Sequence, residues 1–317
     1  AASPSPADEW GGCSIMPEFA VDPALLNNWE RFRYLTEKFG VCHGRLISKF
    51  PKRWKAMVYD GLESVGDIER KKIEICLQRI DEKMQVRAQP AVWDSAKSWL
   101  PNAEDEHARQ PFHAIVAGAN QRKHDRVLTY DDLSEDTLLW AVPREKVVSR
   151  DAISLAGAVS PILRIAKSVI LVDPHFDPYK PRARNTLTVF LKACLDGRID
   201  HALPRVEFHT AFKPATPDFF GECQRQLPRR IPHGMSLRVV RWRERVGGDG
   251  LHNRYILTER GGVRLAWGLD EGNPAQTDDI SLLAPGVYGA RWNQYCGDQS
   301  AFERVDDIVI SGTRVLP

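Results

Sequence analysis

The sequence predicts a mixed α/β protein in two parts, and three observations support this prediction. The chain has 317 residues, enough for about two domains of ordinary size. Apolar residues follow helical spacing in much of the first half, whereas helix and strand patterns alternate in the second. The composition, with 43% hydrophobic and 27% charged residues, is that of a globular protein. We therefore expect a C-terminal mixed sheet flanked by helices, preceded by a mostly helical N-terminal domain.

The N-terminal half is predicted to contain a lead-in and a helical region. Residues 1–22 are expected to form a flexible lead-in, because the first dozen are rich in Ala, Ser, Pro and Gly. Residues 23–148 form the helical region, whose role the sequence does not indicate. Its helices are predicted over residues 23–39, 44–62 (with an interruption at Pro51) and 67–84. Residues 113–117 predict one short strand.

Residues 149–317 show the alternation that is typical of an α/β domain. Helices are predicted over residues 151–166, 185–195 and 218–227. Strands are predicted over residues 169–172, 206–212, 237–242, 254–258 and 263–267. The first of these strands is apolar at every position, as in a strand that is buried on both faces. Gly261 and Gly262 separate two strands and predict a hairpin.

Charge and hydropathy exclude several classes of protein. No apolar run reaches the roughly 18–20 residues that a membrane helix needs, and the formal net charge is only +2. The six cysteines include no Cys-x-x-Cys pair, which argues against a zinc ribbon or a thioredoxin-like motif. The opening residues lack a basic segment followed by an apolar one, so we expect no signal peptide. We also expect free thiols and a cytoplasmic location.

One segment, residues 251–272, contains residues suited to phosphate chemistry. Residues two apart in a strand point to the same face, so His252 and Arg254 are expected side by side. A guanidinium can bind two phosphate oxygens, while an imidazole attacks phosphorus or transfers a proton. A buried histidine beside an arginine in an ordinary ion pair is the alternative interpretation.

This segment resembles the phospholipase D superfamily, whose motif is His-x-Lys-x4-Asp followed by a glycine-led strand end. His252, Arg254 and Glu259 occupy the three spacings, and Gly268-Leu-Asp270-Glu271 falls near the later element. Residues 169–177 resemble the first core strand of such domains. The likeness covers about residues 150–317 and is greatest to degenerate members, including the domain that follows MIT domains in some trafficking proteins and bacterial relatives associated with mobile elements and phage defence.

The resemblance implies a metal-independent phosphodiesterase without a cofactor, more similar to a nuclease than to a lipase. It assigns catalysis to His252, Arg254 and Glu259. Family members with one motif per chain form the site across a homodimer, so a homodimer is expected here. Lys is replaced by Arg and Asp by Glu, which leaves open a degenerate module that binds nucleic acid, a partner protein or an anionic membrane surface without turnover.

Charge distribution favours a nucleic-acid partner. Residues 201–260 contain eleven Lys and Arg against six Asp and Glu, a net charge of +5, whereas residues 261–317 contain four against eight. Arginines interleaved with an aromatic residue suit phosphate contact and base stacking. The predicted phosphate or nucleic-acid contacts are Arg241, Trp242, Arg243, Arg245 and Asp270.

Three further expectations concern partners and metal. The N-terminal region is a candidate for binding a partner protein. A membrane partner is disfavoured, because no amphipathic helix combines a basic face with a bulky apolar one. Asp173, His175 and Asp177 alternate after a strand and predict either a metal site or a corner whose side chains cap the following turn.

Overall fold

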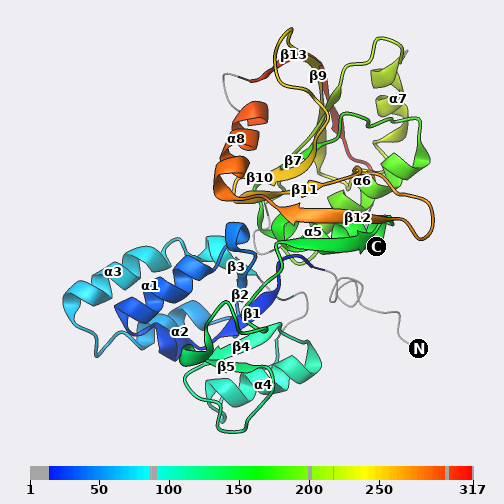
Figure 1. The fold of residues 1–317 in the computed structure, drawn as a ribbon. Coiled ribbons are helices and arrows are strands. Elements are labelled where there is room, and N and C mark those ends of the chain that lie inside the picture. The colour runs from blue at the N-terminus through cyan, green and yellow to red at the C-terminus, as the bar shows by residue number, and fades with distance from the viewer. Residues whose placement is uncertain are drawn as a thin grey trace, which may run out of the picture. The chain divides into compact units, whose positions relative to one another are not determined.

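The computed structural model describes residues 14–85, 87, 91–198, 202–216, 218–296 and 300–315. These residues form two compact units (Figure 1): one spans Met16–Pro143, and the other spans Arg144–Pro317 together with the segment that ends at Ile15. The backbone N–H of Ile15 donates to Ala158 in the second unit, at 3.0 Å. Residues 1–13, the greater part of the expected lead-in, lie outside the described residues. The observed division lies a few residues before the expected boundary at residue 148, because the strand at residues 145–149 belongs to the second sheet.

The first unit is built on a parallel five-stranded sheet in the order β3-β2-β1-β4-β5. Its strands are β1 (Glu18–Val21), β2 (Leu46–Ser48), β3 (Met84–Gln85), β4 (Ala114–Ala117) and β5 (Val127–Thr129). Phe19 on the central strand β1 pairs with Ile47 on one side and Ala114 on the other. Only β4 is predicted by the sequence. The expectation of a mostly helical region therefore missed the sheet that organises its helices.

Helices cover both faces of this sheet. The α-helices are α1 (Trp29–Lys38), α2 (Trp54–Asp60), α3 (Asp67–Leu77) and α4 (Trp99–Arg109), and the 3-10 helices are η1 (Pro23–Leu26), η2 (Val41–His43), η3 (Ile80–Lys83) and η4 (Tyr130–Asp132). One apolar cluster joins α1, α2 and α3 to one face, and a second joins α4 to the other. The helix predicted over residues 44–62 is instead strand β2 followed by helix α2. Pro51, at the predicted interruption, lies between them.

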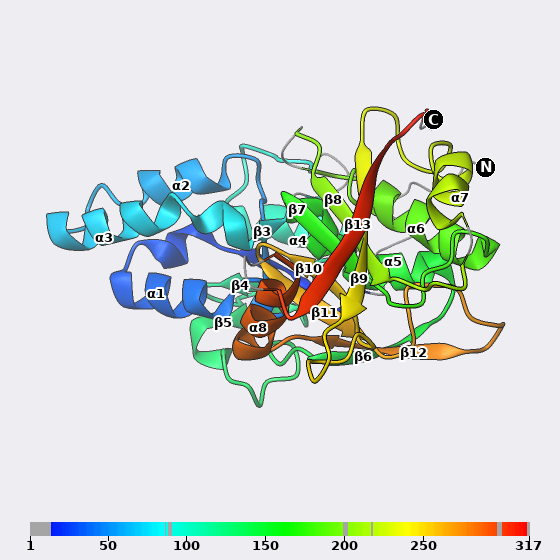
Figure 2. The same cartoon turned by 90° about the horizontal axis from the view of Figure 1, so that it is seen from above.

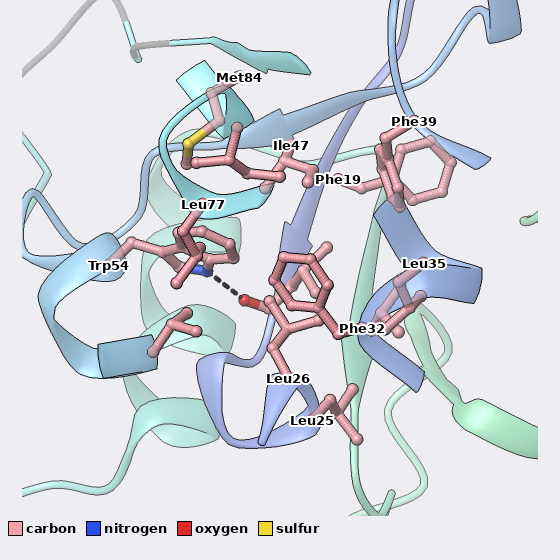
Figure 3. Close-up of a cluster of buried hydrophobic side chains, with 14 of the residues drawn as sticks. Phe19, Leu25, Leu26, Phe32, Leu35, Phe39, Ile47, Trp54, Leu77 and Met84 are labelled. Carbon is pink, nitrogen blue, oxygen red and sulfur yellow. Dashed lines mark hydrogen bonds between the residues drawn. The ribbon is translucent and has the colours of Figure 1, made fainter. Parts of the chain in front are cut away.

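Trp54 anchors the larger of these clusters (Figure 3). The side chain is fully buried, and its indole N–H donates to the carbonyl of Val21 at 2.6 Å. This bond ties the first turn of α2 to the end of the central strand β1. Phe19, Leu26 and Leu77 surround it in the same cluster. The indole therefore contributes both packing and a hydrogen-bond partner for a buried carbonyl.

The substitution Trp54→Phe tests this anchor. It removes the donor to the Val21 carbonyl and leaves a small cavity, so we expect the free energy of unfolding to fall by about 2–4 kcal/mol. Urea denaturation followed by circular dichroism measures the change. The control is Leu138→Ala, whose side chain is 89% exposed in the same unit and which is expected to shift stability by less than about 0.5 kcal/mol. Equal stability of Trp54→Phe and the parent chain would contradict the packing described.

The second unit contains an eight-stranded mixed sheet in the order β13-β9-β8-β7-β10-β11-β12-β6. Its strands are β6 (Glu145–Ser149), β7 (Ser168–Val172), β8 (Arg205–Ala211), β9 (Ser236–Glu244), β10 (Arg254–Thr258), β11 (Gly261–Leu265), β12 (Thr277–Leu282) and β13 (Phe302–Ser311). Strands β7, β8 and β9 are parallel, and all other neighbours are antiparallel. The five predicted strands of this half are present as β7 to β11, including the β10–β11 hairpin. The long edge strand β13 lies beside β9 (Figure 2).

Helices cover this sheet too (Figure 1). On one side lie α5 (Ala152–Ile165), α6 (Pro181–Ala193) and α7 (Phe219–Gln226), and on the other lies α8 (Pro285–Cys296). Asp151 caps α5 as predicted, because its carboxylate accepts from the backbone N–H of Ser154 at 2.8 Å. The mixed α/β class expected for this half is confirmed. Helix α8, strand β12 and the edge strands β6 and β13 were not predicted.

Helix α5 contains an internal proline. Pro161 lacks the N–H that would bond to the carbonyl of Gly157 one turn earlier. The hydroxyl of Ser160 donates to that carbonyl instead, at 3.2 Å. Because Ser160 and Pro161 are buried, water cannot replace this bond. The hydroxyl therefore lets the helix continue without an unpaired carbonyl.

In the described part of the chain, no helix combines the length and apolar character needed to cross a membrane. Its cysteines are not joined by disulfide bonds: Cys42, Cys76, Cys194, Cys223 and Cys296.

Candidate functional site

Topology brings the predicted motif to one edge of the second sheet. The carboxyl ends of the parallel strands β7, β8 and β9 lie at this edge, where ligands of open α/β sheets usually bind. Strand β10 runs antiparallel to β7, with Tyr255 opposite Val172, so Arg254 begins β10 at the same edge. His252 lies two residues before it. We call this region the motif edge.

His252 is exposed at the motif edge. Two neighbours hold the loop that carries it: Glu244 accepts from the backbone N–H of Leu251 at 2.7 Å, and Gly250 leaves room for the ring. A Cβ at Gly250 would lie 2.8 Å from His252 Nδ1. Among the described residues, none forms a hydrogen bond with the imidazole. The imidazole is thus exposed, in the loop that precedes the strand carrying Arg254.

Arg254 is half-buried, and its guanidinium is only partly satisfied. Its Nη1 donates to the carbonyl of His252 at 2.9 Å. Its Nε is buried and has no acceptor in the described ranges of the chain. Buried donors are nearly always paired, because an unpaired one costs free energy. An anion at the motif edge would supply the missing acceptor.

Asp173 organises the backbone around Arg254. The carboxylate is 5% exposed and accepts from the backbone N–H groups of His175 and Leu269, both at 2.8 Å. Burial raises its pKa, while these N–H groups and the charge of Arg254 act in the opposite direction. Gly268 passes close by, since a Cβ there would lie 3.1 Å from Asp173 Oδ2. A larger residue at Gly268 would therefore be in tight contact with this carboxylate, which favours glycine at the position noticed in the sequence.

His175 is a second imidazole at the motif edge. Its side chain follows β7 by three residues, and partial burial together with the charges of Arg254 and Lys213 lowers its pKa. The sequence placed this histidine in either a metal site or a capping corner and did not assign it to the phosphate site. No group of three or more His, Cys, Asp or Glu residues suited to a metal ion occurs in the described part of the chain. Asp173 and Asp177 instead accept backbone N–H groups two residues ahead, as capping side chains in a corner do.

The structure corrects the role expected of Glu259. This residue follows the far end of β10, about 16 Å along the strand from Arg254 at the usual rise per residue. Its carboxylate accepts the backbone N–H groups of Lys167 and Ser168, at 2.9 and 3.0 Å. Glu259 thus holds the start of β7 and does not join His252 and Arg254.

Asp270 also differs from its expected role as a phosphate contact. Its carboxylate forms ion pairs with Arg150 and Arg182, each at 2.8 Å. A carboxylate repels phosphate, but here it positions two guanidiniums close to the motif edge. Both arginines lie far from the motif in sequence, so no local signal could have identified them.

The side chains of Arg241 and Trp242 make contacts within the protein and are not positioned to bind a nucleic acid. Arg241 pairs with Asp306 and stacks against the rings of Phe212, Phe219 and Phe220. Trp242 is 6% exposed, and its indole N–H donates to His209 at 3.1 Å. The expected base stacking by Trp242 does not fit this burial, because strand alternation turns the ring into the core beneath α8.

The two remaining predicted contacts, Arg243 and Arg245, both bond to the start of β13. Arg243 is 51% exposed and pairs with Glu303 on β13. Arg245 donates to the carbonyl of Phe302. The exposed aromatic at the motif edge is instead Trp267, which is 64% exposed and lies 5.7 Å from the guanidinium of Arg150. It follows β11, and its backbone N–H is held by Asp278.

Comparisons of the chain with protein-family models and with curated proteins find no match.

The pKa of His175 tests the electrostatics of this edge. Burial and the neighbouring cations hold it below 6.5, so lowering the pH through 6.5 protonates the unfolded state first and reduces stability. Replacing Arg254 with Gln removes one of these cations, and we expect the pKa of His175 to rise. An NMR pH titration of the imidazole measures the change, with the resonance assigned from His175→Gln.

The control for this titration is Arg225→Gln, because Arg225 is an exposed arginine on α7 that pairs with Asp218 and Glu222. It is expected to leave the pKa of His175 unchanged. An unchanged or lower pKa of His175 in Arg254→Gln would contradict the interaction between the two groups.

Proposed function

We propose that the motif edge binds a phosphodiester of a nucleic-acid backbone and hydrolyses it without a metal ion. The buried Nε of Arg254, which has no acceptor among the described residues, is the observation that carries this proposal. Arg150 and Arg182 add positive charge beside it, and exposed Trp267 offers a face on which a base can stack. The His-x-Arg spacing and its resemblance to the phospholipase D superfamily support the same chemistry.

In the proposed reaction, His252 attacks phosphorus and Arg254 neutralises charge on the phosphoryl oxygens. The bond from phosphorus to the leaving oxygen breaks, and that oxygen takes a proton from a second imidazole. Water then attacks the phosphohistidine, which releases a phosphomonoester and restores His252. The site thus needs two histidines, as the expected homodimer would supply with a second His252.

His175 offers the second imidazole within one chain. The cations around it lower its pKa when no ligand is bound, but a bound phosphate would favour its protonated form. His175 could then donate the proton to the leaving oxygen. We therefore assign the proton donor to His175, and a second copy of His252 is the alternative that the experiment below separates.

Cleavage of labelled single- and double-stranded DNA and RNA in EDTA tests the reaction. We expect His252→Ala to abolish cleavage and Arg254→Gln to reduce it by about 10²–10³-fold. His175→Ala is expected to reduce it by about 10²–10⁴-fold if His175 is the proton donor. His233→Ala is the control, because His233 is exposed near the amino-terminal end of β9.

Full activity of His175→Ala in a homodimer would assign the second imidazole to the partner's His252. Absence of cleavage by the parent chain would end the catalytic proposal.

A specific observation favours non-catalytic binding as the second candidate function: no described residue orients the His252 ring. Binding would then persist without turnover, would weaken with salt, and would depend on Arg254.

Trp267→Ala separates base stacking from charge. We expect it to weaken binding of single-stranded DNA by about 1–3 kcal/mol, because one stacking platform is lost. Fluorescence anisotropy at fixed salt measures the affinity. The control is Trp93→Ala, since Trp93 is also exposed but belongs to the first unit. Equal losses in the two variants would argue against a binding role for Trp267.

A further inference from the structure

A cavity of about 470 Å³ lies over β8 and β9, on the face of the second sheet that carries α8. The last turns of α8 form one wall with Trp292 and Tyr295, and β13 contributes Phe302 and Arg304. The volume falls in the range of about 300–1,000 Å³ that is usual for small-molecule sites. Neither His252 nor Arg254 lines the cavity, so it is separate from the motif edge.

The floor of the cavity is a closed hydrogen-bond chain. The indole N–H of Trp242 can only donate, so Nδ1 of His209 accepts this hydrogen bond. The proton of the imidazole is therefore on Nε2, which donates to the carboxylate of Glu207 at 2.8 Å. Burial lowers the pKa of His209. Burial also opposes ionisation of Glu207, but hydrogen bonds from His209 and Arg205 outweigh it and lower the pKa of Glu207 to about 2. The floor therefore presents a neutral imidazole whose nitrogens are both occupied, which suits binding rather than proton transfer.

Positive charge surrounds this floor. The cavity is lined by four arginines, Arg205, Arg238, Arg245 and Arg304. Two carboxylates face them: Glu207 accepts from Arg205 at 2.8 Å, and Asp307 accepts from Arg238 at 2.7 Å and from Arg304. Four cations against two carboxylates leave a formal charge of +2 in this group. The guanidiniums also stay accessible, because the side chains of Arg205 and Arg304 are 68% and 41% exposed.

A charge of +2 is best matched by a dianion. A phosphomonoester carries about −1.5 to −2 near pH 7, whereas a phosphodiester carries only one negative charge. Half-buried Trp292 on the wall offers a surface on which a planar ring can stack. We propose that this cavity binds a nucleoside monophosphate group, with its phosphate on the arginines and its base against Trp292. A free nucleotide and the phosphorylated end of a nucleic-acid strand share this chemistry.

Isothermal titration of the full chain with AMP, adenosine and 3′,5′-cyclic AMP tests the proposal. We expect AMP to bind at least about tenfold more tightly than adenosine, which lacks phosphate, and than cyclic AMP, which carries a diester. The proposal is overturned if AMP does not bind, or if adenosine or cyclic AMP binds equally well.

Variants locate the binding. Arg238→Gln and Arg304→Gln are expected to weaken AMP binding by about tenfold or more. Trp292→Leu is expected to weaken AMP binding but to leave binding of inorganic phosphate unchanged. Arg225→Gln is the matched control, because Arg225 is 56% exposed and also paired with a glutamate. Thermal unfolding shows which variants stay folded. If Arg238→Gln does not fold, the AMP affinity of Arg304→Gln provides the test. Unchanged AMP affinity in folded Arg304→Gln would place the ligand elsewhere.

Competition with AMP separates the two sources. Displacement by a 5′-phosphorylated oligonucleotide but not by its 5′-hydroxyl form assigns the cavity to a strand end. AMP binding that neither oligonucleotide displaces assigns it to a free nucleotide. Equal displacement by both oligonucleotides would contradict recognition of a phosphomonoester.

Discussion

The buried carboxylate of Asp173 holds together the segments that make the motif edge. It accepts a backbone N–H from its own corner and another from the segment after β11, while its own N–H bonds to the carbonyl of His209 on β8. These bonds connect three parts of the chain that lie far apart in sequence. Because Arg254 starts the strand that pairs with β7, the same carboxylate also shapes the field around its guanidinium. The positions of His175 and Trp267 depend on this arrangement.

The second unit presents two surfaces with different charge balance. At the motif edge, Asp270 offsets one of the two positive charges of Arg150 and Arg182, and the cation of Arg254 lies near buried Asp173. In the cavity under α8, arginines outnumber carboxylates by two. Cleavage of a diester converts one negative charge into nearly two. Under the proposed function, the motif edge would match the charge of the diester substrate, and the cavity would match the charge of its phosphomonoester product.

Sequence patterns predicted the elements that are long or strongly periodic, and they failed where pairing is non-local. Strands β7 and β8 and helices α5, α6 and α7 have clear apolar periodicity. Strand β3, by contrast, spans only Met84–Gln85, too short for periodicity to be detected. Helix α8 begins with Pro285 and contains Gly286 and Gly289, which are poor helix formers. Its stability comes from packing on the sheet, which no local pattern reveals.

The candidate site shows the same limit. Arg254 begins β10 but His252 lies in the loop before it, so strand alternation does not relate their side chains. Motif spacing also put Glu259 with them, although it lies at the other end of the strand. Strand alternation would have predicted that Trp242 points into the core, but only if the sequence showed which face of β9 is buried. Trp267 and Arg150 meet only through tertiary structure.

The paired Ser160 and Pro161 in α5 have a consequence for how this helix tolerates change. The serine hydroxyl replaces the N–H that proline lacks, so the two residues are coupled. Alanine at position 160 would leave the Gly157 carbonyl without a hydrogen-bond donor in an apolar interior. If Pro161 were also replaced by another residue, the backbone N–H at position 161 could restore the regular helical bond. Natural variation at these neighbouring positions is therefore expected to be correlated.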